Sequence, residues 1–105
     1  NFVGNQRANG KILHLNKFKN SGYDKKIVCI ENADPGFDFI FTKKINGLIT
    51  KFGGANSHMA IRCAELGIPA AIGVGDTLFE QIIKSNVITI ECDRKKLIIE
   101  GKYNS

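Results

Sequence analysis

The sequence predicts a single α/β domain with mixed sheets and about three short helices. Three observations support this fold class: short apolar runs typical of strands, stretches with apolar residues at helical spacing, and the alternation of the two along the chain. With 105 residues, 43% of them hydrophobic and 24% charged, the chain has the composition of a globular domain with one core.

The first part of the chain predicts a polar lead-in followed by two strands. Residues 1–9 are polar and glycine-containing, so we expect a linker or N-terminal remnant and a fold that begins at Gly10. Residues 11–15 resemble a short strand, and residues 26–31 contain the apolar run IVCI, which suits a strand covered on both faces. The NSG tripeptide at 20–22 predicts the turn between them.

The middle of the chain predicts two helices on either side of a strand. Asp34 is expected as the N-cap of a short helix with Pro35 in its first turn. Residues 46–50 (NGLIT) predict a strand that ends where a glycine loop begins. A second helix is expected over 57–66, because Gly67 is a typical stop signal.

The last third predicts a buried strand, a helix and a hairpin. Residues 70–75 (AAIGVG) are expected to form the strand, and Asp76 to cap a helix with apolar residues on one face. Residues 87–92 and 96–101 are strand-like and flank the turn at 93–95, so we expect them to pair.

Charge and apolar content predict a cytoplasmic protein that does not bind nucleic acid or membranes. The formal net charge is +5, but the basic residues are scattered, whereas a nucleic-acid surface would group them with aromatic residues. No stretch is long and apolar enough to span a membrane, and the N-terminus lacks a secretory signal pattern.

The three cysteines predict buried free thiols of a cytosolic protein. Cys29, Cys63 and Cys92 lie in apolar stretches at irregular spacing, without a CxxC pair. A disulfide or a structural zinc is the less favoured alternative, and we expect no metal site.

The stretch GGANSH, residues 53–58, predicts an anion site. Gly53 and Gly54 let the backbone bend with its N–H groups uncovered, and the helix start that follows adds unpaired N–H groups and a favourable dipole. His58 stands where an anion would bind, and its neutral imidazole is a nucleophile. The residues alone leave a second interpretation open, in which His58 is an ordinary structural residue of the first turn.

Residues 47–73, GLITKFGGANSHMAIRCAELGIPAAIG, resemble the phosphohistidine motif of the phosphoenolpyruvate-utilising enzymes, T-x-x-G-G-x-T-S-H-x-A-I-x-A-R-E-L-G-I-P-A. That family includes phosphoenolpyruvate synthase, pyruvate phosphate dikinase and the first enzyme of the sugar phosphotransferase system. Weaker similarity extends over nearly all of 10–101. The resemblance implies a swivelling β/β/α domain over 10–101, followed by a tail at 102–105, that carries phosphate between active sites.

The resemblance assigns roles to individual residues of the motif. His58 is implied as the phosphoryl acceptor and donor, with Nε2 as the family's usual nitrogen. Gly53 and Gly54 are implied as the phosphate-binding loop. Thr50 matches the first threonine of the motif, and Ser57 is expected to cap the helix or hydrogen-bond the phosphoryl oxygens.

Three positions depart from the motif. Asn56 replaces the second threonine, so it lacks the hydroxyl but is still expected near the phosphate. Cys63 replaces a small alanine, and the motif arginine falls on Ala64. Arg62 lies one turn after His58, where it is expected either to contact the phosphate or to remain solvated.

The resemblance also implies what the chain requires from elsewhere. No cofactor is expected in this domain; Mg²⁺ and ATP or phosphoenolpyruvate would bind to nucleotide-binding and pyruvate-binding domains of the same chain or of a partner chain. The chain alone is therefore expected to be one part of a phosphotransferase and not a complete enzyme. The alternative is a non-catalytic docking or regulatory module of the same fold.

Three further polar residues are expected to be structural. His14 lies in a predicted strand and is interpreted as a structural or surface residue. Asp34 and Asp38 are interpreted as a helix cap and a surface residue, and not as a paired acid and base.

Overall fold

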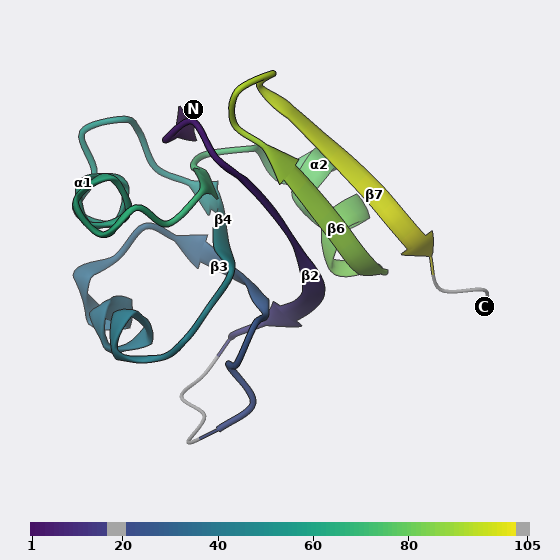
Figure 1. The fold of residues 1–105 in the computed structure, drawn as a ribbon, viewed down its shortest axis with the longest axis horizontal. Coiled ribbons are helices and arrows are strands. Elements are labelled where there is room, and N and C mark those ends of the chain that lie inside the picture. Colours follow the sequence, from purple (N-terminus) through teal and green to yellow (C-terminus); the bar gives the residue numbers. More distant parts are fainter. Residues whose placement is uncertain (17–20, 103–105) are drawn as a thin grey trace.

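A computed structural model describes residues 1–16 and 21–102 as a seven-stranded sheet with helices on both faces (Figure 1). The strands in chain order are β1 (Phe2–Val3), β2 (Arg7–His14), β3 (Ile27–Asn32), β4 (Gly47–Phe52), β5 (Ala70–Ala71), β6 (Ser85–Glu91) and β7 (Lys96–Lys102). The helices are the 3-10 helix η1 (Pro35–Thr42), α1 (His58–Leu66) and α2 (Asp76–Ile83). The predicted α/β class with mixed pairing and three short helices is confirmed.

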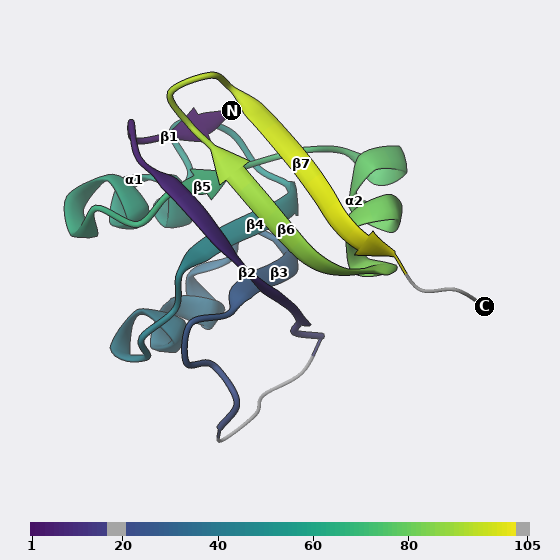
Figure 2. The ribbon, with the colours of Figure 1, turned by 45° about the vertical axis from the view of Figure 1, so that its right-hand side comes forward.

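The sheet order β1-β5-β4-β3-β2-β6-β7 combines parallel and antiparallel pairs. Strands β2, β3, β4 and β5 are parallel neighbours, whereas β1 at one edge and β6 and β7 at the other pair antiparallel. Residues 12–14 of β2 pair with β3, and residues 7–11 pair with β6. Because β2 changes partner along its length, the sheet curls, and the β6–β7 hairpin turns across α2 (Figure 2).

The parallel strands bury side chains on both faces. Successive strand residues point to opposite sides, so Val28 and Ile30 of β3 join the core beneath α1 and η1, while Ile27 and Cys29 join the core around α2. All four are fully buried. The IVCI run thus forms the doubly covered strand that the sequence predicts, and each of its isoleucines contributes about 2 kcal/mol of transfer free energy.

Most of the residues that the sequence predicts to begin or end the helices do so in the structure. The Asp34 carboxylate accepts a hydrogen bond from the Gly36 N–H at 2.8 Å, and Pro35 begins η1. Ser57 is the N-cap of α1, and Gly67 ends that helix in the left-handed conformation with φ 70°. The predicted hairpin of β6 and β7 is also confirmed.

The stretch interpreted as a lead-in, 1–9, is instead part of the sheet. Strand β1 pairs with β5, and β2 begins at Arg7, not at Gly10. The polar composition is misleading because β2 alternates exposed and half-buried residues, and Arg7 ion-pairs with Asp93 on its exposed side at 3.1 Å. A strand with one solvated face needs few apolar residues.

Two further boundaries differ from the sequence prediction. The strand expected at 70–75 is only two residues long, because Gly73 and Gly75 have positive φ values and turn the chain toward α2. Gly75, not Asp76, is the N-cap of α2, and no side chain caps that helix. The expected tail begins at Lys102, which is instead the last residue of β7, and residues 103–105 lie outside the described residues. Residue 20 of the predicted turn at 20–22 also lies outside them.

The cysteines are free and buried, as expected. Burial raises the pKa of the Cys63 thiol to about 12 and also raises the pKa values of Cys29 and Cys92. Within residues 1–16 and 21–102, no helix combines the length and the apolar character that a membrane crossing requires.

Candidate functional site

His58 lies at the junction between β4 and α1, where a tight glycine turn joins strand to helix. Gly53 has φ 132°, and a Cβ atom there would lie 2.7 Å from the Cβ of Ala33. Gly54 has open space around it, and its carbonyl oxygen accepts a hydrogen bond from the Ser57 N–H at 3.0 Å. The turn therefore requires glycine at 53, whereas position 54 tolerates a side chain.

The N-terminus of α1 is arranged to attract negative charge. The Ser57 hydroxyl accepts a hydrogen bond from the Ala60 N–H at 3.4 Å, and α1 begins at His58. The first turn of α1 contains no acidic residue. The positive end of the helix dipole is thus not neutralised from within the helix.

The His58 side chain is 40% exposed and meets a carboxylate from a different helix. Its Nε2 atom lies 2.8 Å from Oδ1 of Asp38, which is in η1. Nε of Arg62 lies 3.4 Å from the same Oδ1 atom, and Nη1 of Arg62 lies 3.3 Å from Glu65. The three side chains His58, Asp38 and Arg62, called here the histidine cluster, link α1 to η1.

Asp38 is ionised, so it is the negatively charged member of this cluster. Its pKa is lowered chiefly by the hydrogen bond with His58; burial opposes this shift, and the positive charge of Arg62 lowers the pKa further by a smaller amount. An ionised carboxylate only accepts hydrogen bonds. The proton between the two side chains therefore belongs to the imidazole.

Asp38 belongs to this site, although its sequence context predicts only a surface residue. A signal was present, because Asp38 is the single charged residue of η1 among prolyl, glycyl, aromatic and other uncharged residues. Its partner, however, is 20 positions away and comes close only because α1 and η1 pack on the same face of the sheet.

The other predicted phosphate-binding residues fall into two groups. Asn56 is exposed beside the turn, and Arg62 is ion-paired and lies over the ring of Phe41, so it is not a freely solvated arginine. Thr50 is fully buried, and its hydroxyl accepts a hydrogen bond from the Gly73 N–H at 2.9 Å. The phosphate-binding role predicted for Thr50 is therefore corrected to a structural one, which joins the turn after β4 to the turn before α2.

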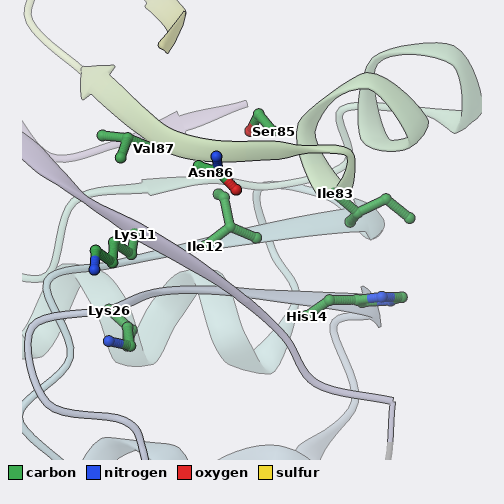
Figure 3. A pocket seen from close by; sticks show the side chains of 8 residues that line it. All are labelled: Lys11, Ile12, His14, Lys26, Ile83, Ser85, Asn86 and Val87. Atoms are coloured by element: carbon green, nitrogen blue, oxygen red, sulfur yellow. The ribbon is translucent and has the colours of Figure 1, made fainter. Parts of the chain in front are cut away.

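Two hollows open near these elements, and the smaller one adjoins the glycine turn. It measures about 380 Å³ and is lined by Asn32, Ala33, Asp34, Phe52, Gly53 and Ser57. The larger, of about 650 Å³, opens where β2 leaves β6 and contains none of the predicted site residues. Figure 3 shows its lysines, Lys11 and Lys26, at one end and His14 at the other.

His14 has the structural surroundings expected for it. Its ring packs edge-on against Phe79, with the centroids 5.7 Å apart. Its Nε2 atom is buried and has no hydrogen-bond partner among the described residues. Of the two histidines, only His58 presents its ring beside charged groups at a helix N-terminus.

The arrangement at His58 has the features that transfer of an anionic group requires. An exposed imidazole supplies a nucleophile, the N-terminus of α1 supplies N–H donors and dipole, and Arg62 supplies a positive charge one turn along the same face. Because Gly53 fixes the turn and Ser57 fixes the helix start, the ring is held on a rigid base.

Comparison with known proteins gives one family and several relatives. Residues 22–95 match the family model "PEP-utilising enzyme, mobile domain". The chain is 34% identical to phosphoenolpyruvate synthase of Aquifex aeolicus over 97% of this chain, and 30% identical to that of Helicobacter pylori over 86%. It is 43% identical to a probable phosphoenolpyruvate synthase of Staphylothermus marinus over 72%.

The matched region is a small part of each relative. The chain spans 12%, 11% and 9% of the lengths of these three proteins, respectively. The turn, the helix and the histidine described above all lie inside the region matched by the family model. The chain therefore belongs to the family of mobile domains of phosphoenolpyruvate-utilising enzymes.

Proposed function

We propose that this chain is the phosphoryl-carrier domain of a phosphotransferase of the phosphoenolpyruvate synthase type, with His58 as the residue that accepts and donates the phosphoryl group. The observation that carries the proposal is the exposed His58 ring at the N-terminus of α1, directly after the Gly53 turn, in a domain of this family. The alternative of a non-catalytic docking module is not favoured by the family comparison.

The transfer step requires positioning and charge stabilisation more than covalent catalysis by the protein. A ring nitrogen of His58 attacks phosphorus, a P–N bond forms, and the bond from phosphorus to the leaving group of the donor breaks. The phosphoryl oxygens would then lie near the N–H groups at the start of α1 and near Arg62. In the return step the acceptor attacks phosphorus and the P–N bond breaks.

The remaining parts of the reaction belong to other domains in this proposal. The relatives named phosphoenolpyruvate synthase are about eight to eleven times longer than the matched region, given the 12% and 9% that it spans. Nucleotide-binding and pyruvate-binding domains, in the same chain or in a partner chain, would hold Mg²⁺ with ATP or phosphoenolpyruvate. The domain described here would move between them with its phosphohistidine.

The test uses the two histidines of the chain as a matched pair. The chain is incubated with partner domains of a phosphoenolpyruvate synthase and with phosphoenolpyruvate or ATP, and the protein is analysed by intact mass and ³¹P NMR. We expect one phosphoryl group that is labile to acid and stable to base. His58→Ala should abolish it, and the control His14→Ala should retain it. Equal labelling of the wild type and His58→Ala would refute the proposal.

A further inference from the structure

The hydrogen bond between Asp38 and His58 involves the ring nitrogen Nε2 and not Nδ1. Among the described residues, Asp38 is the one side chain that hydrogen-bonds this ring. The contact is part of the exposed surface that joins α1 to η1, where Arg62 also meets Asp38 and the ring of Phe41. It can therefore open without unfolding either helix.

The chemistry of this contact determines where the ring has a free electron pair. Asp38 is ionised, as its lowered pKa indicates, so it accepts and Nε2–H donates. In the neutral ring the electron pair then resides on Nδ1, and in the imidazolium neither nitrogen has one. In both forms Nε2 cannot attack a phosphorus atom while Asp38 holds it.

We propose, on the basis of the carrier function above, that Asp38 is a positioning residue that masks Nε2 of His58 in the free domain and must release the ring before Nε2 can be phosphorylated. On release, the ring proton moves through solvent from Nε2 to Nδ1, and Nε2 gains the electron pair. Phosphorylation would therefore follow a docking event that displaces Asp38. In the free domain, the contact would limit phosphoryl transfer to His58 from small donors in solution.

Arg62 makes the release favourable once phosphate is present. Its Nε atom lies 3.4 Å from the same Oδ1 atom that accepts from His58, and its Nη1 atom lies 3.3 Å from Glu65. A phosphoryl group on Nε2 would occupy the position of the carboxylate and repel it. The guanidinium group can pair with either anion, so Asp38 and the phosphoryl group would compete for Arg62.

The first measurement is the protonation state of the ring in the 105-residue chain labelled with ¹⁵N. Long-range ¹H–¹⁵N spectra distinguish Nε2–H from Nδ1–H directly. We expect the wild type to hold the neutral ring as Nε2–H, and Asp38→Ala to show a larger Nδ1–H fraction. Glu65→Gln removes a neighbouring carboxylate that does not touch His58, so it should match the wild type. Equal Nδ1–H fractions in wild type and Asp38→Ala would refute the mask.

The second measurement is the rate of phosphorylation of Nε2 by phosphoramidate, which needs no partner domain. Nε2 displaces ammonia from phosphorus, a P–N bond to the ring forms as the P–N bond of the donor breaks, and the ring keeps its proton on Nδ1. We expect Asp38→Ala to react faster than wild type by a factor of about 1.4 to 5, the range that corresponds to the 0.2–1 kcal/mol of an exposed ion pair. Asp38→Asn keeps the side-chain size and a weaker, uncharged acceptor oxygen, so it should accelerate the reaction less than Asp38→Ala, and it replaces Asp38→Ala if that variant does not fold.

The two proposals fail in different ways. The masking role of Asp38 would be overturned if phosphoramidate phosphorylated Asp38→Ala no faster than the wild type. It would also be overturned if Glu65→Gln were accelerated equally. Both results would leave the carrier function intact. Absence of a phosphohistidine after incubation with partner domains and phosphoenolpyruvate would overturn the carrier function, whereas the state of the ring would still be decided by the ¹⁵N spectra.

Discussion

Two junctions of this domain lead from a parallel strand through glycines into a helix, and they differ in how the helix start is neutralised. One connects β4 to α1 through Gly53, and the other connects β5 to α2 through Gly73 and Gly75. They lie against each other, because the Gly73 N–H donates to the Thr50 hydroxyl and a Cβ at Gly73 would overlap with the carbonyl oxygen of Gly53.

The junction at α2 is neutralised by its own helix. Asp76, the first residue of α2, lies 3.0 Å from the Nζ atom of Lys51, which also lies 3.6 Å from Glu31. The hydrogen bond with Asp76 is the main reason that the pKa of Lys51 is raised. A carboxylate in the first turn of a helix interacts favourably with the positive end of its dipole, and it remains part of that helix.

At the α1 junction the negative charge comes instead from η1, where Asp38 contacts the side chains of His58 and Arg62. A carboxylate that comes from a separate element can leave when another anion arrives, whereas Asp76 cannot leave its own helix. The two helix starts therefore differ in the origin of their carboxylate, although both follow a strand and a glycine turn, and this difference supports the binding role proposed for the start of α1.

The largest expected effect is on the glycine that shapes the α1 junction. Gly53→Ala should lower the free energy of unfolding by about 2–4 kcal/mol, because the added Cβ meets Ala33 and the backbone keeps a positive φ. The adjacent control Gly54→Ala adds its Cβ to open space, so it should change stability by less than about 1 kcal/mol. Urea unfolding followed by circular dichroism measures both. Similar losses in the two variants would contradict the assignment of the tight turn to position 53.

The sequence predicts the parts of this comparison that depend on local signals. The Asp34 and Ser57 caps, the Gly67 stop and the doubly buried strand at β3 all follow from neighbouring residues, and the structure confirms them. Strand β2 begins at Arg7, earlier than the sequence predicts, because a strand with one solvated face resembles a polar linker.

The residues that the sequence does not resolve are those whose partners are distant along the chain. Thr50 looks like a phosphate ligand in the motif, but its hydroxyl is occupied by Gly73, 23 positions away. Asp38 looks like an ordinary surface acid until η1 and α1 pack on one face of the sheet. Composition and periodicity describe each helix alone and contain no information on which polar atoms of two helices meet.

An intermediate effect is expected from the cap that distinguishes the two helix starts, since α1 has a side-chain cap and α2 has none. Ser57→Ala should lower the free energy of unfolding by about 0.5–1 kcal/mol, near the lower end for N-caps because the bond to the Ala60 N–H is long. Ser57→Asn keeps a side-chain acceptor and should restore most of the loss. Urea unfolding of the three proteins measures the effect. If Ser57→Ala and Ser57→Asn are equally destabilised, the cap is not the cause.

The smallest effect tests whether the contact of Asp38 with α1 persists in solution. Because the pKa of Asp38 is lowered in the folded chain, the folded state binds fewer protons than the unfolded state just below an ordinary aspartate pKa of about 3.9. The stabilisation is therefore complete above that value and is lost as the pH falls through the lowered one. Asp38→Asn removes this contribution, so its stability should fall less steeply than that of the wild type in urea unfolding below about pH 5.

Asp93 provides the matched control for that measurement. Its pKa is also lowered, mainly by the hydrogen bond with Arg7, and it shares no partner with Asp38. Asp93→Asn should remove a separate part of the acid dependence, and the two changes should add in the double variant. If Asp38→Asn had the acid dependence of the wild type while Asp93→Asn did not, the carboxylate would be absent from the ring in solution. The α1 junction would then present an unmasked histidine, and its difference from the α2 junction would be larger still.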